Sequence, residues 1–249
     1  MCISWVAYSG FMADAAETPY VGKELDLFAL ADNWKSYVKA QIASYLTGDV
    51  LEVGAGIGAT TAALHDGTAR HWVCLEPDAS LASRLQARIL GSSTAPTTQV
   101  IVGSLSTFTE QACFDCILYI DVLEHIEDDR RQIEVAAQLV RPGGHIIVLS
   151  PAHQWLFSEF DKSIGHLRRY EKSTLKSLKP SGWIEMKLIY LDSFGLFLSL
   201  GNVLVLRQAV PTRSQIAIWD RPCVPLSRLF DRLSCGLIGK SVLAVWCKG

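Results

Sequence analysis

The sequence lacks a surplus of basic residues and a long apolar run. Its 249 residues carry 23 lysines and arginines against 25 aspartates and glutamates, which gives a formal net charge of −2. Nucleic-acid-binding domains normally show a basic surplus or a basic stripe, so we expect no nucleic-acid partner. The uncharged run at 194–206 is shorter than the roughly twenty apolar residues that a membrane-spanning helix needs. We therefore expect no integral membrane segment.

The sequence also lacks a regular cysteine pattern. Its seven cysteines are scattered through apolar contexts. Cys113 and Cys116 form a C-x-x-C pair, but they lie at the start of a predicted strand, where alternate residues point to opposite faces. We therefore interpret them as buried thiols and expect a reducing, cytoplasmic location.

We expect two parts in the chain, a poorly defined N-terminal segment at 1–32 and a single domain at 33–249. The first residues are apolar but follow no basic residue, which argues against a signal peptide. Recognisable pattern begins only after Met12, so Met12 is a second candidate for the native start. With 49% hydrophobic residues, the chain can bury the core of one α/β domain.

The rest of the sequence is organised around a glycine-rich loop. Residues 50–58 read Val-Leu-Glu-Val-Gly-Ala-Gly-Ile-Gly, and a helix-forming segment follows. This pattern predicts the strand, tight turn and helix start of a nucleotide-binding α/β unit. Gly54, Gly56 and Gly58 can adopt dihedral angles that are closed to other residues, which leaves room for a ligand beside the turn. Glu76 follows at the tip of the second predicted strand, where an acidic side chain would bind a ribose diol.

Three further strings agree with one protein family. Glu52 lies directly before the glycines, residues 114–129 read Phe-Asp-Cys-Ile-Leu-Tyr-Ile-Asp-Val-Leu-Glu-His-Ile-Glu-Asp-Asp, and residues 139–144 read Leu-Val-Arg-Pro-Gly-Gly. In this order they resemble the class I S-adenosylmethionine (SAM)-dependent methyltransferases, over residues 34–192. The resemblance implies SAM as the cofactor and a doubly wound, Rossmann-like α/β fold. Its seven-stranded sheet would be mostly parallel, with the last strand antiparallel and helices on both faces.

The resemblance also implies which residues hold the cofactor. They lie in the glycine loop and after the following predicted strands, at the edge where open α/β sheets bind ligands. The set is Glu52, Gly54, Ala55, Gly56, Gly58, Glu76, Pro77, Ser104, Leu105, Asp121 and Val122. The Leu-Glu-His turn that ends at His125 is mainly structural in the family, so we expect no metal.

The segment after the fifth predicted strand should bind the methyl acceptor. It leaves the ligand-binding edge of the sheet and concentrates polar side chains without helical or strand alternation. Residues 161–170 read Asp-x-x-x-Gly-His-x-Arg-Arg-Tyr, which resembles the signature of a bacterial methyltransferase subgroup. His166 or His153 is the candidate base for a hydroxyl acceptor, because imidazole titrates near neutral pH.

The same segment supplies candidates for substrate binding. Arginine can bind a carboxylate or a phosphate in bidentate geometry, which lysine cannot. Alternatively, Asp161 pairs with Arg169 and only fixes the loop. The candidate substrate-binding residues are Asp161, Arg168, Arg169 and Tyr170.

The seventh strand of the family is postponed in this chain. Residues 184–191 predict the sixth strand and residues 241–247 the seventh, which leaves 193–240 as a helical insertion that would cap the substrate site. The apolar helix predicted at 194–206 is read as a buried cap helix, with a dimer interface and an interfacial membrane contact as alternatives. A second helix at 226–237 is predicted to be an amphipathic surface helix.

We therefore expect SAM-dependent methyl transfer to a small-molecule or lipid-linked acceptor, at oxygen. The oxygen assignment rests partly on the absence of an Asn-Pro-Pro-Tyr-type motif. Two alternatives remain open. Residues 54–59 also satisfy the dinucleotide fingerprint of NAD(P)-dependent oxidoreductases, although no Tyr-x-x-x-Lys pair is evident. A non-catalytic SAM-binding protein would keep the glycine loop and tolerate the loss of either candidate histidine. A homodimer is compatible with both the main reading and this last alternative.

Overall fold

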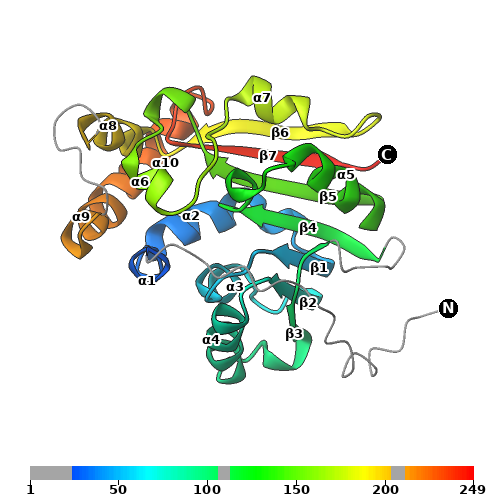
Figure 1. Ribbon diagram of the computed structural model, residues 1–249. Helices are drawn as coiled ribbons and strands as arrows, with labels where there is room; N and C mark the ends of the chain where they lie inside the picture. The colour runs from blue at the N-terminus through cyan, green and yellow to red at the C-terminus, as the bar shows by residue number, and fades with distance from the viewer. Residues whose placement is uncertain (1–23, 106–112, 203–210) are drawn as a thin grey trace.

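The computed structural model describes residues 24–105, 113–202 and 211–249 (Figure 1). Met12 and most of the predicted N-terminal segment lie outside the described residues, as do residues 203–206 of the predicted apolar helix. The described residues form a seven-stranded sheet in the order β3-β2-β1-β4-β5-β7-β6. The strands are β1 (Gly48–Val53), β2 (Ala69–Glu76), β3 (Thr98–Val102), β4 (Phe114–Ile120), β5 (Val140–Pro151), β6 (Ile184–Leu191) and β7 (Ser241–Cys247).

The strand directions confirm the predicted fold class. Strands β1 to β5 pair in parallel, whereas β7 lies between β5 and β6 and is antiparallel to both. Strand β6 therefore precedes β7 in the sequence, but β7 is the strand that lies next to β5 in the sheet. The described residues between β6 and β7, 192–202 and 211–240, are mainly helical, as predicted.

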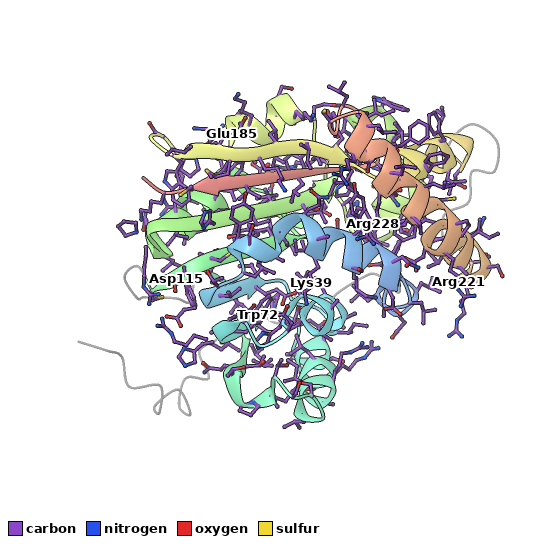
Figure 2. The ribbon with its side chains drawn as sticks, turned by 180° about the vertical axis from the view of Figure 1, so that it is seen from behind. Lys39, Trp72, Asp115, Glu185, Arg221 and Arg228 are labelled. Atoms are coloured by element: carbon purple, nitrogen blue, oxygen red, sulfur yellow. The ribbon has the colours of Figure 1, made fainter. Side chains whose placement is uncertain are left out.

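Helices cover both faces of the sheet. Lys39 of α2 and Arg228 of α10 lie on the face seen in Figure 2, and α5 and α7 lie on the opposite face (Figure 1). The longer helices are α2 (Asp32–Ile42), α4 (Ala79–Leu90), α5 (Asp129–Leu139), α8 (Ser193–Gly201) and α10 (Val224–Leu233). The short ones are α1 (Leu25–Phe28), α3 (Ala59–Leu64), α6 (Glu159–Ser163), α7 (Lys172–Ser177), α9 (Arg213–Ile218), the π-helix η7 (Trp219–Cys223) and the 3-10 turns η1 (Ala43–Tyr45), η2 (Ala95–Thr97), η4 (Leu123–His125) and η5 (Gln154–Leu156).

Two apolar layers hold these helices on the sheet. One layer contains Trp34, Val38 and Ile42 of α2 together with inward residues of α4 and η7. The other contains Ile133 and Ala136 of α5 with inward residues of α7. Alternate residues of each central strand enter one layer or the other, because side chains alternate across a strand. This explains why β1, β4 and β5 are buried on both faces.

Capping side chains set where several helices begin. Asp78 accepts hydrogen bonds from the backbone nitrogens of Ser80 and Leu81 at 2.8 and 3.0 Å and so caps α4. Helix α2 has no cap of its own. Instead, Asp220 of the insertion accepts from the backbone nitrogen of Trp34 at 2.9 Å. The insertion between β6 and β7 is thereby tied to the first long helix of the chain.

Helix α10 reverses the usual orientation of an amphipathic helix. Its buried side is polar, because Asp231 accepts from the backbone nitrogen of Asp192 at 2.6 Å and from the Tyr37 hydroxyl at 2.9 Å, while Ser227 donates to Asp192 at 2.7 Å. Its exposed apolar side chains are Leu226, Leu229, Phe230 and Leu233, with 45 to 72% of their surface exposed. The predicted surface helix is present, but its apolar side faces solvent.

Two other expectations concern cysteine chemistry and membranes. Cys113 and Cys116 are not in a disulfide, and Cys116 is buried as expected, whereas Cys113 is only half-buried. Burial raises the pKa of Cys116 above its ordinary value. Within the described part of the chain, no helix is both long enough and apolar enough to cross a membrane.

Candidate active site

A cavity of about 470 Å³ lies at the carboxyl ends of β1, β4 and β5. This is the edge at which open α/β sheets bind ligands. Its wall combines the glycine loop, the turn after β4, the segment after β5 and the helices of the insertion. The short helix α1 also contributes Leu25 and Phe28. Segments that are far apart in the sequence therefore meet around one space.

In the glycine loop, backbone atoms without large side chains line the cavity. Gly54 has a φ of +67°, and a Cβ atom at this position would lie 2.7 Å from Cγ2 of Val122, so only glycine fits. Gly56, with a φ of +56°, donates its backbone N–H to Oε2 of Glu76 at 2.7 Å. Gly54, Ala55 and Gly56 all line the cavity. A loop of this shape fits a nucleoside cofactor that approaches the backbone closely.

Two buried carboxylates support the loop. Glu52 lines the cavity, and its Oε2 accepts from the Thr61 hydroxyl at 2.8 Å and the Trp72 indole at 2.9 Å. Burial raises the pKa of Glu52 to about 7, against these hydrogen bonds and with help from the charge of Glu76. Glu76 accepts from the backbone nitrogens of Gly56 and Asp78, and its burial raises the pKa of this carboxyl too. Its side chain braces the glycine loop, and the ribose contact stays a prediction.

The other predicted cofactor residues are divided between the cavity and its surroundings. Asp121, with a φ of +53°, is exposed to the cavity, and desolvation by the surrounding protein raises its pKa to about 6 against the charges of His166 and Lys240. Leu105 is buried in the apolar layer that also contains α5, whereas Ser104 is exposed. The roles of the predicted residues outside the cavity wall stay predictions; these residues are Gly58, Glu76, Pro77, Ser104, Leu105 and Val122.

Asp161 is the centre of the acceptor side of the cavity. It is fully buried and forms a bidentate pair with Arg169, with N–O distances of 2.8 and 2.9 Å. His166 Nδ1 lies 2.8 Å from Asp161 Oδ1, and Ser158 donates its backbone N–H and its hydroxyl to Oδ2. Burial alone would raise the pKa of Asp161, but the bonds from His166 and Arg169 hold it below its usual range. Asp161 therefore fixes both His166 and Arg169, and all three line the cavity.

The three remaining predicted residues of this segment lie outside the cavity wall. His153 has its Nε2 3.0 Å from the Gly239 carbonyl oxygen and its Nδ1 3.2 Å from Glu171. Arg168 pairs with Asp129 at 2.9 Å, and the Tyr170 hydroxyl donates to the same carboxylate at 2.7 Å. These contacts tie the loop to α5 and to the start of α7. The catalytic role of His153 and the substrate contacts of Arg168 and Tyr170 stay predictions.

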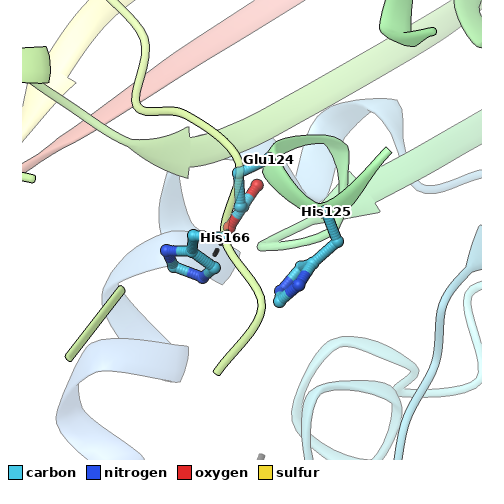
Figure 3. A group of neighbouring side chains, drawn as sticks. All are labelled: Glu124, His125 and His166. Carbon is cyan, nitrogen blue, oxygen red and sulfur yellow. Dashed lines mark ion pairs between the residues drawn. The ribbon is translucent and has the colours of Figure 1, made fainter. Parts of the chain in front are cut away.

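Figure 3 shows a compact cluster of Glu124, His125 and His166 beside the cavity. Glu124 and His125 come from the turn η4 after β4, and His166 faces them from the loop after α6. Nε2 of His166 lies 3.8 Å from Oε1 of Glu124, and the two imidazole rings meet edge to face at 4.6 Å. Burial raises the pKa of Glu124 well above its ordinary value. Burial also lowers the pKa of His125 to about 4, together with the charge of His166.

The sequence interpretation missed Lys240 and Trp219. Lys240 and Trp219 line the cavity. Nζ of Lys240 lies 3.9 Å from the centre of the Trp219 ring and 3.6 Å from Oδ2 of Asp192. A signal for Lys240 was present, because β7 was predicted to be antiparallel. An antiparallel strand begins at the edge where its parallel neighbours end. The residue just before β7 therefore had to reach the ligand-binding edge.

Comparisons with known proteins place this cavity in context. Residues 51–146 match the family model described as "Methyltransferase domain". No protein of curated function matches the chain at a significant level.

Solved structures match over most of the chain. A geranyl diphosphate methyltransferase in complex with SAM is 12% identical, with a TM-score of 0.63 over 96% of this chain and 93% of that chain. A SAM-dependent methyltransferase from Mesorhizobium loti is 17% identical, with a TM-score of 0.59 over 88% of this chain and 99% of that one. The N-methyltransferase NodS from Bradyrhizobium japonicum, in complex with S-adenosylhomocysteine, is 15% identical, with a TM-score of 0.54 over 85% of this chain and 83% of that one. At these identities the likeness establishes the fold.

The strand order of the sheet also distinguishes the two classes of protein that share this glycine spacing, the SAM-dependent methyltransferases and the dinucleotide-binding domains. Dinucleotide-binding domains have the parallel strand order 3-2-1-4-5-6. Here an antiparallel β7 lies between β5 and β6; the methyltransferase resemblance implied its antiparallel direction. This strand order fits the fold of a SAM-dependent methyltransferase rather than that of a dinucleotide-binding domain. Together, the match over residues 51–146, the glycine loop and this strand order show that the chain contains a methyltransferase domain with the class I fold.

Proposed function

We propose that this methyltransferase acts on a hydroxyl oxygen of a small-molecule or lipid-linked acceptor bound in the cavity. The observation that carries the proposal is the shared cavity wall, in which the glycine loop and the polar cluster around Glu124 and His166 face one space. When bound, SAM supplies an electrophilic methyl group, which passes to the acceptor oxygen while the sulfur keeps the electron pair of the broken bond. The hydroxyl proton has to leave in the same reaction.

The polar cluster suits a hydroxyl acceptor. Asp161 holds Nδ1 of His166, which leaves Nε2 on the side of Glu124. Asp121 lies in the same cavity, and its pKa of about 6 leaves most of its carboxylate ionised at neutral pH. Removal of a proton needs a group of this kind within hydrogen-bonding reach of the acceptor. The cluster is therefore the part of the wall where we expect the acceptor hydroxyl to lie.

The insertion favours an apolar acceptor. Leu198, Ile216, Ile218 and Trp219 line the cavity on this side. Leu198 and Ile218 are strongly exposed, by 44 and 57%. An open apolar wall of this kind suits the entry of an apolar chain.

An exposed apolar patch adjoins this entry. It consists of Phe197, Leu198, Leu226, Leu229, Phe230 and Leu233, on α8 and α10. The two helices pack together, with the rings of Phe194 and Phe230 5.3 Å apart. Large exposed apolar patches commonly mark lipid or protein contacts. The patch favours the lipid-linked member of the acceptor class.

The test is a methyl-transfer assay with a matched pair of acceptors. Purified protein and SAM are incubated with an isoprenoid alcohol or with the corresponding primary amine. S-adenosylhomocysteine and methylated products are measured by mass spectrometry. We expect methylation of the alcohol. Methylation of the amine alone would overturn the oxygen assignment.

A variant pair tests the site. His166→Gln should reduce turnover at least tenfold and leave SAM affinity, measured by calorimetry, unchanged. His71→Gln is the control, because His71 lies near the start of β2, away from the cavity, and should match the wild type. Equal loss of turnover in both variants would contradict the placement of the acceptor hydroxyl.

A further inference from the structure

We propose that Glu124, His125 and His166 bind a divalent transition-metal ion at the acceptor side of the cavity. The site is inferred from its own geometry, while its role in activating a hydroxyl rests on the proposed function. The sequence interpretation expected no metal, because the Leu-Glu-His turn was read as structural. His166 lies beside this turn in space, although it follows about forty residues later in the chain. Its imidazole adds a third ligand to those that Glu124 and His125 offer.

The three side chains present a compact set of ligand atoms. One carboxylate oxygen and one nitrogen from each imidazole lie within 4.8 Å of one another. Glu124 and His125 are adjacent in η4, and His166 approaches them from the opposite loop (Figure 3). Tetrahedral bonds of about 2.1 Å put ligand atoms roughly 3.4 Å apart, so the 3.8 Å between Glu124 and His166 has to shorten only slightly. Ligand atoms up to 4.8 Å apart have to approach by about 1.4 Å, and side-chain rotation has to supply this movement when an ion binds.

The buried carboxylate of Glu124 is the first observation that points to a cation. Its side chain is 0% exposed, and neither oxygen has a hydrogen-bond partner of ordinary geometry among the described residues, although the Ser150 hydroxyl lies close enough to act against the raised pKa of this carboxyl. Buried polar groups are nearly always satisfied, and leaving one unpaired is costly. His166 Nε2 is the nearest ion-pairing nitrogen, yet 3.8 Å is too long for a hydrogen bond. A bound cation satisfies the carboxylate and the imidazole together.

The partner of His166 is the second, independent observation. Metal-binding histidines usually bond through their other ring nitrogen to a carboxylate, which fixes the ring and its tautomer. Nδ1 of His166 makes such a contact, at 2.8 Å from Oδ1 of Asp161. Arg169 and Ser158 in turn hold Asp161. With its proton on Nδ1, His166 turns an electron pair on Nε2 toward Glu124.

The donor set selects the class of metal. Two imidazole nitrogens and one carboxylate oxygen suit zinc, manganese or iron, whereas magnesium and calcium prefer oxygen ligands only. Three protein ligands leave a position open for a substrate oxygen. A hydroxyl oxygen in that position loses its proton more readily. Asp121, which lines the same cavity, is the residue placed to receive the proton, and the oxygen keeps the electron pair of the broken O–H bond.

The test is metal binding by the full-length protein, measured without an acceptor. The chain is treated with a chelator, desalted and titrated with Zn²⁺ by calorimetry and with Mn²⁺ by electron paramagnetic resonance. We expect one ion per chain for at least one of the two metals. Glu124→Gln should weaken binding at least tenfold. Glu127→Gln makes the same change on an exposed residue of the same turn and should bind like the wild type.

Two more variants keep the test decisive. His125→Gln removes a less buried ligand and replaces Glu124→Gln if circular dichroism shows that the latter unfolds. Asp161→Asn changes a positioning residue, and we expect a 10- to 100-fold weaker metal affinity with one site still present. Absence of binding to the wild type, or equal binding to the wild type and the folded ligand variant, would overturn the site.

Parallel calorimetry with SAM separates this proposal from the proposed function. If SAM binds and neither metal does, the metal site fails and the methyltransferase assignment is untouched. If metal binds as expected but only an amine is methylated, the oxygen assignment fails while the metal site stands.

Discussion

Glu52 should make the protein less stable as pH rises, and Glu52→Gln should remove this effect. The side chain is only 2% exposed, and its Oε2 accepts from both Thr61 and Trp72. A glutamine keeps one oxygen that can accept both of these bonds, while it cannot ionise. The substitution thus isolates the cost of placing a carboxylate charge in the wall of the cavity.

The sign and the size follow from the pKa. Burial raises the pKa of Glu52 from 4.5 to about 7, so the folded state holds the proton more tightly than the unfolded state does. The free energy of unfolding therefore falls as pH rises from 4.5 to 7 and is constant above that range with respect to this group. At about 1.4 kcal/mol per pH unit, the full loss is about 3 kcal/mol. About 2.5 kcal/mol of it falls between pH 5 and pH 8.

The assay is urea denaturation of the wild type and Glu52→Gln at pH 5 and pH 8. We expect the variant to gain about 2.5 kcal/mol relative to the wild type between the two pH values. Other carboxyls with raised pKa values, such as Glu76 and Asp121, are present in both proteins and cancel in the comparison. Glu127→Gln, an exposed control, should show no such gain. An equal effect of Glu52→Gln at both pH values would refute the raised pKa.

Three further predictions concern the loop, the insertion and the patch. Gly54→Ala forces a Cβ against Val122 at a positive φ, which should cost at least about 1–2 kcal/mol and weaken SAM binding. Adding Val122→Ala should recover part of both losses. If calorimetry shows full SAM affinity in Gly54→Ala, the glycine loop does not bind SAM through its bare backbone as proposed. Asp220→Ala removes the cap of α2 and should cost about 0.5–2 kcal/mol in urea denaturation, whereas no loss would mean that α2 begins without it. Leu233→Gln, at a side chain that is 72% exposed, should change stability by less than about 0.5 kcal/mol and reduce binding to anionic lipid vesicles in a sedimentation assay. Unchanged vesicle binding would exclude α10 as a lipid contact.

The sheet and the glycine loop could be predicted because their signals are local. The apolar run before Gly54 and the capping Asp78 each lie within a few residues of the feature that they define. The number of strands and the antiparallel direction of the last one followed from the family resemblance, and the long gap before residues 241–247 indicated where the insertion lies. These features depend on chain neighbours and on regular alternation, which a sequence displays directly.

The acceptor side of the cavity could not be assembled in this way. His153 and His166 look equivalent in the sequence, yet Asp161 orients one toward the cavity while Glu171 and the Gly239 carbonyl lie against the ring nitrogens of the other. The alternative pairing of Asp161 with Arg169 is present, but the same carboxylate also holds His166, so the two readings of this loop do not exclude each other. Contacts between segments that are far apart in the chain produce no periodic pattern in the amino-acid sequence.

Helix α10 shows a different limit of sequence reasoning. Its alternating pattern was read correctly as amphipathic, but periodicity does not say which side faces the core. Ser227 and Asp231 face inward because Asp192, Ser193 and Tyr37 offer polar partners there. The apolar side of the helix therefore faces outward. Only the positions of these partners could have revealed the orientation.

The cap that Asp220 places on α2 has a consequence for biosynthesis. Chains leave the ribosome from the N-terminus, at about 5–20 residues per second, and domains tend to fold as they emerge. Helix α2 emerges early, but its cap is made 186 residues later than Trp34. Strand β7 emerges later still and must enter between β5 and β6, so β5 presents an unpaired edge to other nascent chains until then. The last thirty residues therefore complete the fold as a whole, and a ribosome that stalls before them leaves an aggregation-prone chain.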